Sequence, residues 1–447
     1  MNKVFGLLGE KLGHSFSPLI HSFLGDYEYH LYEVAHDDFD SFMRERRFDG
    51  INVTIPYKQD VMPYCKTLSD EARAIGCVNT IIKDNKGNLH GYNTDYHGFK
   101  FMLEYGKINP AGKKVVIAGD GASARTVRTV LNDLDAKEIL TASRFGKINY
   151  RNIFRHYDAD ILVNTTPVGM FPSNGTLPLC IKGFKQLTGV VDLIYNPAKT
   201  KLLLEIEKLD IPCVGGLSML VAQAELASRL FHGGIGGNQL LKRADGARIS
   251  GVFKGLKLGG RRDDTGVYSE LELTEFVYSI IRKVLQKTLN IAIIGMPGCG
   301  KTSVGRVIAK KTQRQFCDID ELIEATAGKS IAEIFEKDGE DYFRSLETQI
   351  LSDVSKKSGL VIATGGGVVT QPENSDLLRQ NSVIIYLKRD LEELDIRGRP
   401  LSDSEGVQAL AEQRLDLYEL WSDCAVQAGM GVEQTADWIL AALGVTE

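Results

Sequence analysis

The sequence predicts an α/β protein built on parallel sheets with crossover helices. Short apolar runs such as "GINVTI", "VVIAG" and "SVIIYL" alternate with amphipathic segments of helical length. Two glycine-rich turns, at 119–124 and 295–302, each follow an apolar run and precede a helical pattern. At 447 residues the chain exceeds what one hydrophobic core usually supports, so we expect two or three domains.

Composition excludes several classes of protein. The formal net charge of −5 gives no reason to expect a nucleic-acid or acidic-membrane partner. Seven cysteines form no C-x-x-C pair, and the histidines show no metal-ligand spacing. The first apolar run is interrupted by Glu10 and Lys11, and no run is long enough to cross a bilayer. We therefore expect a cytoplasmic protein with reduced thiols, no membrane span and no protein-bound zinc.

The alternation of strands and helices breaks once, between 233 and 268. This stretch is glycine-rich and basic, as expected of a linker or an insertion. A nucleic-acid patch is the alternative, but aromatic residues that could stack on bases are nearly absent. The break separates a front block of roughly 230 residues from a back block of roughly 160.

The front block contains a dinucleotide signature. In "KKVVIAGDGASARTV" an apolar strand leads into Gly119-x-Gly121-x-x-Ala124 and then a helix, the order that sets a pyrophosphate against a helix N-terminus. A purely structural turn stays open as an alternative. The next strand ends in Arg144, with Lys147 close behind, where an NAD site would carry an acidic residue. Basic residues there favour the 2′-phosphate of NADP, although a solvated basic turn is the alternative.

Polar side chains gather in the residues before that signature. Ser15 and Ser17 precede a helix that begins with proline, and "GINVTIPYK" ends in Lys58. Asp95 follows in "GYNTDYHG". A lysine and an aspartate beside one carbonyl form a proton-delivery pair, which reduction of a ketone needs in addition to a hydride. A surface lysine and a capping aspartate remain the alternative reading of Lys58 and Asp95.

The back block opens with "GMPGCGKT", which fits the phosphate-binding loop G-x-x-x-x-G-K-[ST]. Its glycines let backbone N–H groups surround a polyphosphate, while Lys301 reaches the terminal phosphates and Thr302 faces Mg²⁺. The loop by itself indicates only a nucleotide.

A family resemblance adds to this reading of the front block. The motifs "GHSFSP", "NVTIPYK", "CVNT", "GYNTDYHG", "GDGASAR", "NTTPVGM", "DLIYNP" and "GGLSMLVAQA" follow one another in order. By them, residues 3–232 resemble shikimate dehydrogenase. The resemblance implies reversible reduction of 3-dehydroshikimate to shikimate by NADPH, with Lys58 and Asp95 as the catalytic pair. Implied substrate-binding residues are Ser15, Ser17, Thr54, Asn79, Asp95, Tyr195 and Gln223. Implied NADP-binding residues are Gly119, Gly121, Ala122, Ser123, Ala124, Arg144, Lys147, Leu193 and Gly216, with Gly216 at the nicotinamide.

The back block is similar to a second family. "GMPGCGKT", "FCDIDELIE", "YFRSLE", "ATGGGVV", "RGRPLS" and "EQRLDLYE" lie in the order found in shikimate kinase. The resemblance implies transfer of a phosphoryl group from Mg-ATP to the 3-hydroxyl of shikimate, with Asp320, Lys301 and Arg399 as catalytic residues. Implied shikimate-binding residues are Asp320, Arg344, Gly365, Gly366, Gly367 and Arg414, with Glu347 orienting an arginine. Implied ATP-binding residues are Gly298, Cys299, Gly300, Lys301, Thr302, Ser303 and Arg399, and Thr302 and Asp318 would hold Mg²⁺.

Together these resemblances predict a bifunctional enzyme with three folded parts. We expect a substrate-binding α/β domain at 1–105, with helices at 217–232 and 270–287 packing back on it. A Rossmann NADP-binding domain is expected at 106–216, a linker or insertion at 233–268, and a P-loop domain with a parallel sheet, like nucleoside-monophosphate kinases, at 289–447. Three alternatives stay open. The front block could use quinate or NAD, the back block could phosphorylate another small acid, or one block could be an inactive ligand-sensing module.

Overall fold

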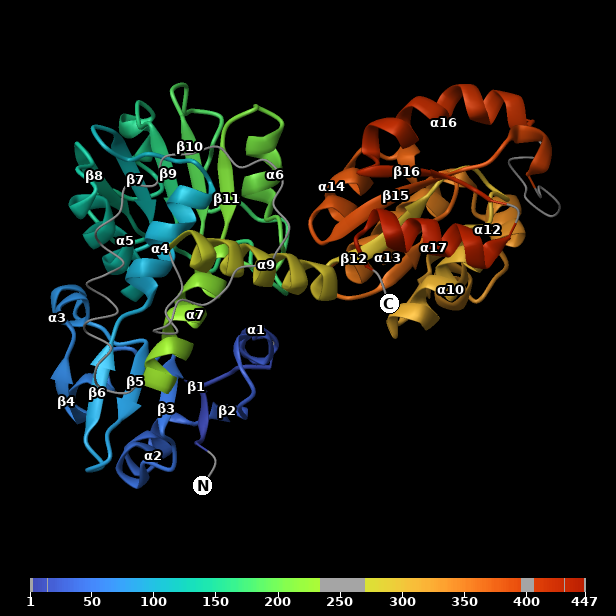
Figure 1. Cartoon of the computed structure of the whole chain (residues 1–447). Coiled ribbons are helices and arrows are strands. Elements are labelled where there is room, and N and C mark those ends of the chain that lie inside the picture. The colour runs from blue at the N-terminus through green and yellow to red at the C-terminus, as the bar shows by residue number, and fades with distance from the viewer. Residues whose placement is uncertain (1–2, 14, 234–269, 395–405, 430, 446–447) are drawn as a thin grey trace. The chain divides into compact units, whose positions relative to one another are not determined.

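The computed structural model describes residues 3–13, 15–233, 270–394, 406–429 and 431–445 (Figure 1). The chain forms two compact units. The first comprises 1–167, 178–195 and 206–284, and the second comprises 168–177, 196–205 and 285–447. The glycine-rich stretch at 233–268, apart from Gly233, lies outside the described residues. The boundary between the units near 284 falls inside helix α9 (Glu270–Thr288).

The first sheet of the first unit has six strands in the order β2-β1-β3-β5-β6-β4. Its strands are β1 (Phe5–Gly9), β2 (Tyr29–Glu33), β3 (Gly50–Val53), β4 (Cys65–Leu68), β5 (Thr80–Lys83) and β6 (Leu89–Tyr92). Its helices are α1 (Ser17–Leu24), α2 (Phe39–Glu45) and α3 (Asp70–Ile75). The sheet is mixed, because β5 pairs antiparallel with both β3 and β6. The short turn between β5 and β6, with Gly87 at φ 78°, makes a hairpin where a parallel pair would need a crossover.

The second sheet is parallel, in the order β11-β10-β9-β7-β8. Its strands are β7 (Lys114–Ala118), β8 (Glu138–Ala142), β9 (Ile161–Asn164), β10 (Gly189–Asp192) and β11 (Cys213–Gly215). The helices in this part of the chain are α4 (Asp95–Tyr105), α5 (Ala122–Asp133), α6 (Lys201–Glu207) and α7 (Leu217–Gly233). Helices α4 and α7 pack against each other between the two sheets of the unit (Figure 1). Tyr278 of α9 contacts the rings of Phe101 and Tyr105 on α4.

The third sheet is parallel, in the order β13-β14-β12-β15-β16. Its strands are β12 (Asn290–Ile294), β13 (Phe316–Asp318), β14 (Val361–Ala363), β15 (Ser382–Lys388) and β16 (Cys424–Gln427). Its helices are α10 (Lys301–Thr312), α11 (Ile319–Ala327), α12 (Ile331–Lys337), α13 (Glu340–Ser355), α14 (Glu373–Arg379), α16 (Val407–Trp421) and α17 (Val432–Ala442). Strand β12 is buried on both faces, since Ile293 and Ile294 belong to two different apolar clusters. A central parallel strand covered by helices on both sides requires this pattern.

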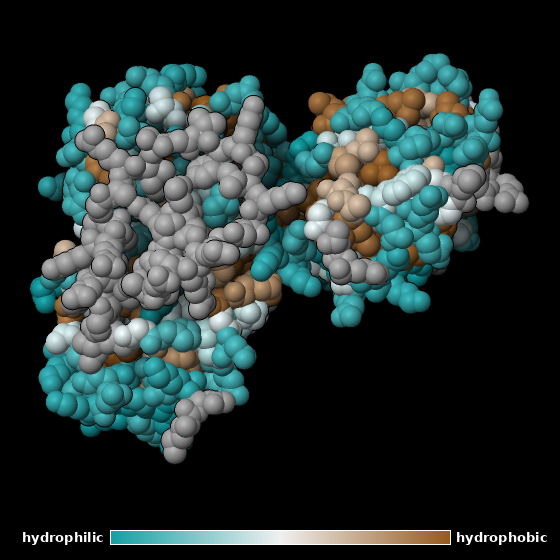
Figure 2. Space-filling view, in the orientation of Figure 1, coloured by the Kyte–Doolittle hydropathy of each residue, from teal (hydrophilic) through white to brown (hydrophobic). Residues whose placement is uncertain are grey.

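These three sheets confirm the predicted α/β class with parallel sheets; the antiparallel pairs of the first sheet are the one difference from the predicted pattern. On the face shown in Figure 2, hydrophilic side chains cover most of the described surface, with hydrophobic residues in scattered patches. In the described ranges, no helix combines the length and the apolar character that crossing a membrane requires.

Candidate active sites

Lys58 and Asp95 form a nearly enclosed ion pair in the first unit. Lys58 lies in the turn after β3, and Asp95 is the first residue of α4. Lys58 Nζ is 2.6 Å from Asp95 Oδ2, and the two side chains are only 14% and 11% exposed. Burial acts to lower the pKa of Lys58, but the charge of Asp95 and its hydrogen bond outweigh this effect and raise the pKa. The lysine therefore remains an ammonium at neutral pH, able to give a proton to an oxygen that gains negative charge.

A buried network of neutral groups lies beside this pair. Asn79 Oδ1 accepts the backbone N–H of Thr94 at 2.7 Å, and Asn79 Nδ2 donates to Thr94 Oγ1 at 2.9 Å. Gln223 Oε1, on α7, accepts from Thr94 Oγ1 at 3.2 Å and from Asn79 Nδ2 at 3.4 Å. Amides and hydroxyls fixed in this way suit recognition of a polyhydroxylated ligand. Thr94 was not predicted from the sequence, and its signal was its place directly before Asp95.

The same network extends to the serines before α1. Thr80 joins Asn79 to Asn52, whose Oδ1 accepts from Tyr29 Oη at 2.7 Å. Tyr29 in turn hydrogen-bonds Ser17. The predicted residues Ser17, Asn79 and Gln223 are thus linked through side chains that the sequence did not single out.

Ser15 and Tyr195 lie next to Ser17 of this network, whereas Thr54 directly follows β3. Burial raises the pKa of Tyr195, whose phenol hydrogen-bonds Ser15. The Ser15 hydroxyl also accepts the backbone N–H of Ser17 at 3.2 Å. The Thr54 backbone N–H donates to Leu8 at 2.9 Å, which fixes the end of β3 beside β1.

The glycine turn between β7 and α5 fits a dinucleotide. Gly119 has φ 105°, and a Cβ there would lie 2.6 Å from Thr165 Oγ1. Gly121, the N-cap of α5, faces open space, and the first turn of α5, which contains Ala122, Ser123 and Ala124, carries no acid. An open helix N-terminus without a nearby carboxylate on the helix suits a pyrophosphate. Arg144 and Lys147 lie on the loop after β8, the strand next to β7.

Gly216, predicted to lie at the nicotinamide, and Leu193, predicted to bind NADP, approach each other closely through their backbones. A Cβ at position 216 would lie 2.0 Å from the Leu193 carbonyl oxygen. Only glycine allows this close approach between the ends of β10 and β11.

In the second unit, the phosphate-binding loop joins β12 to α10. Gly298 and Gly300 have φ 77° and 102°, conformations that favour glycine. Lys301 Nζ donates to the carbonyls of Gly295 at 2.8 Å and Met296 at 3.0 Å. Cys299 is buried inside the loop, whereas Ser303 is exposed on the first turn of α10.

Thr302 and Asp318 lie close together beside that loop. Thr302 Oγ1 donates to Asp318 Oδ2 at 2.7 Å. Asp318 Oδ1 accepts the backbone N–H of Asp320 at 3.0 Å and so caps α11. A hydroxyl and a carboxylate side by side are the hard oxygen donors that Mg²⁺ prefers, so the residues fit the ion.

The three glycines after β14 pack against the side chains predicted to bind substrate. A Cβ at Gly367 would lie 2.2 Å from the Arg344 guanidinium. A Cβ at Gly365 would lie 2.6 Å from Glu347 Oε1 and 2.9 Å from Asp320 Oδ1. Gly366 packs on the loop residue Pro297. The sequence did not indicate that these side chains would occupy the space beside the glycines.

Buried charges surround these glycines. Arg344 Nη1 donates to Glu347 Oε2 at 2.7 Å, and Arg344 Nη2 donates to Glu340 Oε1 at 3.1 Å. Burial raises the pKa of Glu347 and Arg344 opposes this effect, with a raised pKa as the result. Arg414, on α16, is 3% exposed, and its Nε is buried without a hydrogen-bond partner among the described residues. An unpartnered guanidinium donor in the same charged cluster, where Arg414 acts to lower the pKa of Glu347, fits a carboxylate ligand.

One residue of this site was not predicted from the sequence, and one predicted residue is not described by the structure. Tyr418 was not predicted; its hydroxyl donates to the Gly366 carbonyl. Its signal was a spacing of four residues from Arg414, which puts both on one face of α16. Arg399, predicted as a catalytic and ATP-binding residue, falls in the stretch 395–405, which lies outside the described residues.

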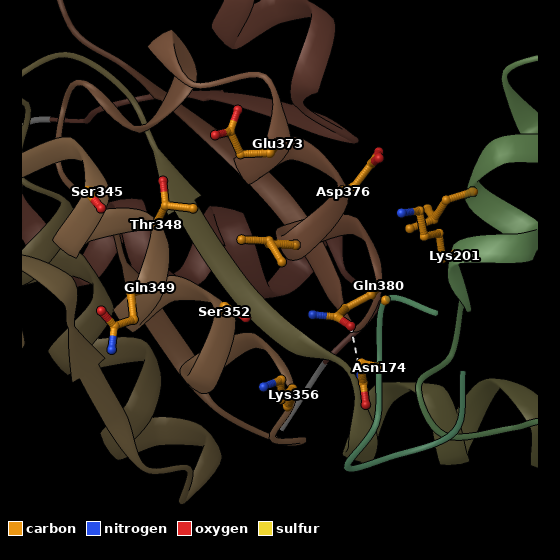
Figure 3. A pocket seen from close by; sticks show the side chains of 13 residues that line it. Asn174, Lys201, Ser345, Thr348, Gln349, Ser352, Lys356, Glu373, Asp376 and Gln380 are labelled. Atoms are coloured by element: carbon orange, nitrogen blue, oxygen red, sulfur yellow. Dashed lines mark hydrogen bonds between the residues drawn. The ribbon is translucent and has the colours of Figure 1, made fainter. Parts of the chain in front are cut away.

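A separate pocket of about 480 Å³ lies in the second unit (Figure 3). Ser345 and Thr348 of α13 and Glu373 and Asp376 of α14 are among its lining residues. The lining includes none of the residues predicted to bind phosphate or substrate, so the pocket is distinct from the candidate active sites.

Comparison with known proteins separates the two halves of the chain. Residues 7–81 match the family model of the shikimate dehydrogenase substrate binding domain, and residues 297–443 match that of shikimate kinase. The shikimate dehydrogenase (NADP(+)) of Clostridium perfringens is 40% identical over 253 residues, which are 52% of this chain and 93% of that protein. That of Caldanaerobacter subterraneus subsp. tengcongensis is 34% identical over 260 residues, 52% of this chain and 92% of that protein.

One solved structure is similar over a larger part of the chain. A chorismate mutase/shikimate 5-dehydrogenase fusion protein from Clostridium acetobutylicum has a TM-score of 0.51 at 31% identity. The match covers 64% of this chain and 98% of that one.

Proposed function

This chain belongs to the shikimate dehydrogenase family and carries a shikimate kinase domain behind that part, and we propose that it catalyses two consecutive steps of the shikimate pathway. The first is reduction of 3-dehydroshikimate to shikimate with NADPH. The second is phosphorylation of shikimate to shikimate 3-phosphate with Mg-ATP. The observation that carries the first activity is the enclosed Lys58–Asp95 pair, with 2.6 Å between Nζ and Oδ2, beside a network of neutral hydrogen-bonding groups.

In the reduction, Gly119 and Gly121 would hold NADPH, which would supply the hydride. Lys58 donates a proton to the carbonyl oxygen of the substrate as negative charge develops there. Asp95 holds the lysine in place and keeps it protonated, since its charge raises the lysine pKa. Asn79 and Gln223 hold ring hydroxyls, which aligns the carbonyl with Lys58. Ser15, Ser17, Thr54 and Tyr195 complete the substrate site.

Selection of NADP rests on Arg144 and Lys147. A 2′-phosphate beside two cations gains charge-assisted hydrogen bonds that the 2′-hydroxyl of NAD does not offer. This favours NADP over the NAD alternative. Steady-state comparison of the two cofactors, and of shikimate with quinate, tests both choices.

In the phosphorylation, the chain's residues orient the two reactants. Asp320 accepts a hydrogen bond from the 3-hydroxyl and directs it for in-line attack. Arg344 and Arg414 grip the carboxylate of shikimate, and Glu347 fixes Arg344 through its 2.7 Å ion pair. Lys301 and Arg399 would stabilise charge on the transferred group, and Thr302 and Asp318 would hold Mg²⁺, which would neutralise charge on the phosphates.

Two assays on the purified protein test the proposal. Addition of 3-dehydroshikimate should cause loss of NADPH absorbance with formation of shikimate. Addition of shikimate and Mg-ATP should yield shikimate 3-phosphate by mass spectrometry. An inactive ligand-sensing module would show no turnover in one of the two assays, and a kinase for another small acid would show no ATP consumption that depends on shikimate. A cytoplasmic location and the domain boundaries stay predictions of the sequence.

A further inference from the structure

Phe145 is 96% exposed, the highest value among the large hydrophobic residues that the structure describes as exposed. It lies three residues after the end of β8, between Arg144 and Gly146. A ring exposed to this degree offers its faces to a bound ligand, and its place in the fold decides which ligand it can reach.

The loop that presents Phe145 is held by hydrogen bonds. Ser143 N donates to the Ile148 carbonyl at 3.1 Å, which closes the loop at its base. Asn149 Nδ2 donates to the Gly146 carbonyl at 3.3 Å, and Asn152 Nδ2 donates to the Lys147 carbonyl at 2.9 Å. These hydrogen bonds therefore fix the conformation of the loop that carries Phe145.

This loop lies beside the dinucleotide turn. Gly119 N donates to the Ala142 carbonyl at 2.8 Å, so the ends of β7 and β8 are joined where the glycine turn begins. In a dinucleotide fold the adenosine half of the cofactor lies at the carboxyl end of the second strand, which is β8 here. The Arg144 guanidinium carbon is 6.0 Å from the centre of the Phe145 ring, so charge and ring are presented together.

We propose that Phe145 stacks on the adenine of the bound cofactor, while Arg144 takes the 2′-phosphate. The inference rests on the proposed NADP-dependent reduction and adds to it a residue that recognises the base. Stacking is tolerant of substituents but needs a flat apolar face, which a nearly bare phenyl ring offers.

Phe154 provides a matched control. It lies in the short helix Ile153–His156 of the same domain, is 57% exposed, and has the Arg155 guanidinium 5.8 Å from its ring centre. Like Phe145 it is an exposed ring with an arginine neighbour, but it does not follow a strand that adjoins the glycine turn.

The proposal predicts a specific pattern of cofactor kinetics. NADPH and NADH share the adenine, so Phe145→Ala should raise the KM of both by the same factor, about fivefold or more. Arg144→Ala should raise the KM of NADPH alone. Phe145→Trp should restore the wild-type KM, because a larger flat face replaces the lost one.

Calorimetric titration of the full-length protein with 2′,5′-ADP tests the proposal without turnover. Phe145→Ala should weaken binding by about fivefold or more, and Phe154→Ala should bind like the wild type. Equal binding by wild type and Phe145→Ala, equal weakening in both alanine variants, or no binding to the wild type would each overturn the inference. If binding depends on Phe145 while 3-dehydroshikimate is not reduced, the inference stands and the proposed reduction fails.

Discussion

The two candidate active sites are held together by different forces. In the first unit, Asn79, Thr94 and Gln223 are neutral groups that share hydrogen bonds with one another. In the second unit, charged groups dominate, and Arg344 lies between Glu340 and Glu347. A neutral network fixes hydrogen-bond donors and acceptors at set positions. It can therefore distinguish ligands by the positions of their hydroxyl groups. A charged cluster binds an anion strongly, but it has to exchange one ionic partner for another.

The lysines of the two sites show the same contrast. Lys58 already faces the carboxylate with which it is proposed to act. Lys301 instead donates to two carbonyls of its own loop, so reaching a phosphate requires exchange of these hydrogen bonds. The reductase site is therefore preorganised to a greater degree than the kinase site.

Silencing each site separately should give the largest effects. Lys58→Met should slow turnover in the reductase reaction by about 10²- to 10⁴-fold, because it removes the proton donor. Asp320→Asn should slow phosphoryl transfer by a similar factor. Both rates are measured on each variant. A variant that loses both activities would show that the two sites are not independent.

The charged cluster should respond strongly to loss of one partner. Arg344→Met leaves Glu347 buried without its cation, and we expect the second unit to lose about 3–5 kcal/mol of unfolding free energy. Trp421 and Trp438 are the only tryptophans and both lie in this unit, so their fluorescence in urea reports on it.

A second variant separates stability from binding. Arg344→Met with Glu347→Leu should regain part of the stability, since Glu347 no longer lies buried without Arg344, but the protein should still bind shikimate poorly at the kinase site. Full recovery of the kinase KM in the double variant would contradict the role of Arg344 as carboxylate anchor.

The neutral surroundings of the first site predict a pH effect. His21 stacks on Tyr29 with ring centres 3.8 Å apart, and burial lowers its pKa to about 3, against a hydrogen bond to Asn52 that raises it. The unfolded chain binds a proton below about pH 6.5 and the folded chain does not, so stability should fall by about 1.4 kcal/mol per pH unit as the pH drops from there towards 3.

Calorimetric unfolding of the first unit at pH 7 and pH 5 measures this loss, which should be about 2 kcal/mol. His21→Asn should flatten the dependence by that amount. An unchanged slope in the variant would show that other groups cause it.

The smallest expected effect comes from Thr94, and it distinguishes the substrate site of the reductase from that of the kinase. Thr94→Val removes the hydroxyl that bridges Asn79 and Gln223 and leaves only their direct 3.4 Å hydrogen bond, at a cost of about 1–1.5 kcal/mol. The reductase KM for shikimate should rise about fivefold to tenfold, whereas the kinase KM should stay the same. Thr94→Ser keeps the hydroxyl and should behave like the wild type. A rise in KM in both variants would point to packing rather than hydrogen bonding.

Some features of the molecule were predictable because they depend on local sequence. The strand–glycine–helix units at 119 and 295 and the α/β class follow from patterns within about 20 residues. The link from Ser17 through Tyr29 and Asn52 to Asn79 was not predictable, because it depends on which strands become neighbours. The strand order places β3 beside β5 although β4 lies between them in sequence.

The glycines at 365–367 show a further limit. Their sequence indicated that space was needed near the substrate, but not that Arg344 and Glu347 would fill part of it. That information resides in α13, which packs beside the loop, and no spacing within the loop encodes it.

The central claim is that one chain carries two separate pockets for the same ring acid, and the stoichiometry of shikimate binding tests it most directly. Calorimetric titration of the purified protein should give two bound shikimates per chain, and the Arg344→Met/Glu347→Leu variant should retain one. Binding of a single shikimate to the wild type, or of none, would contradict the account.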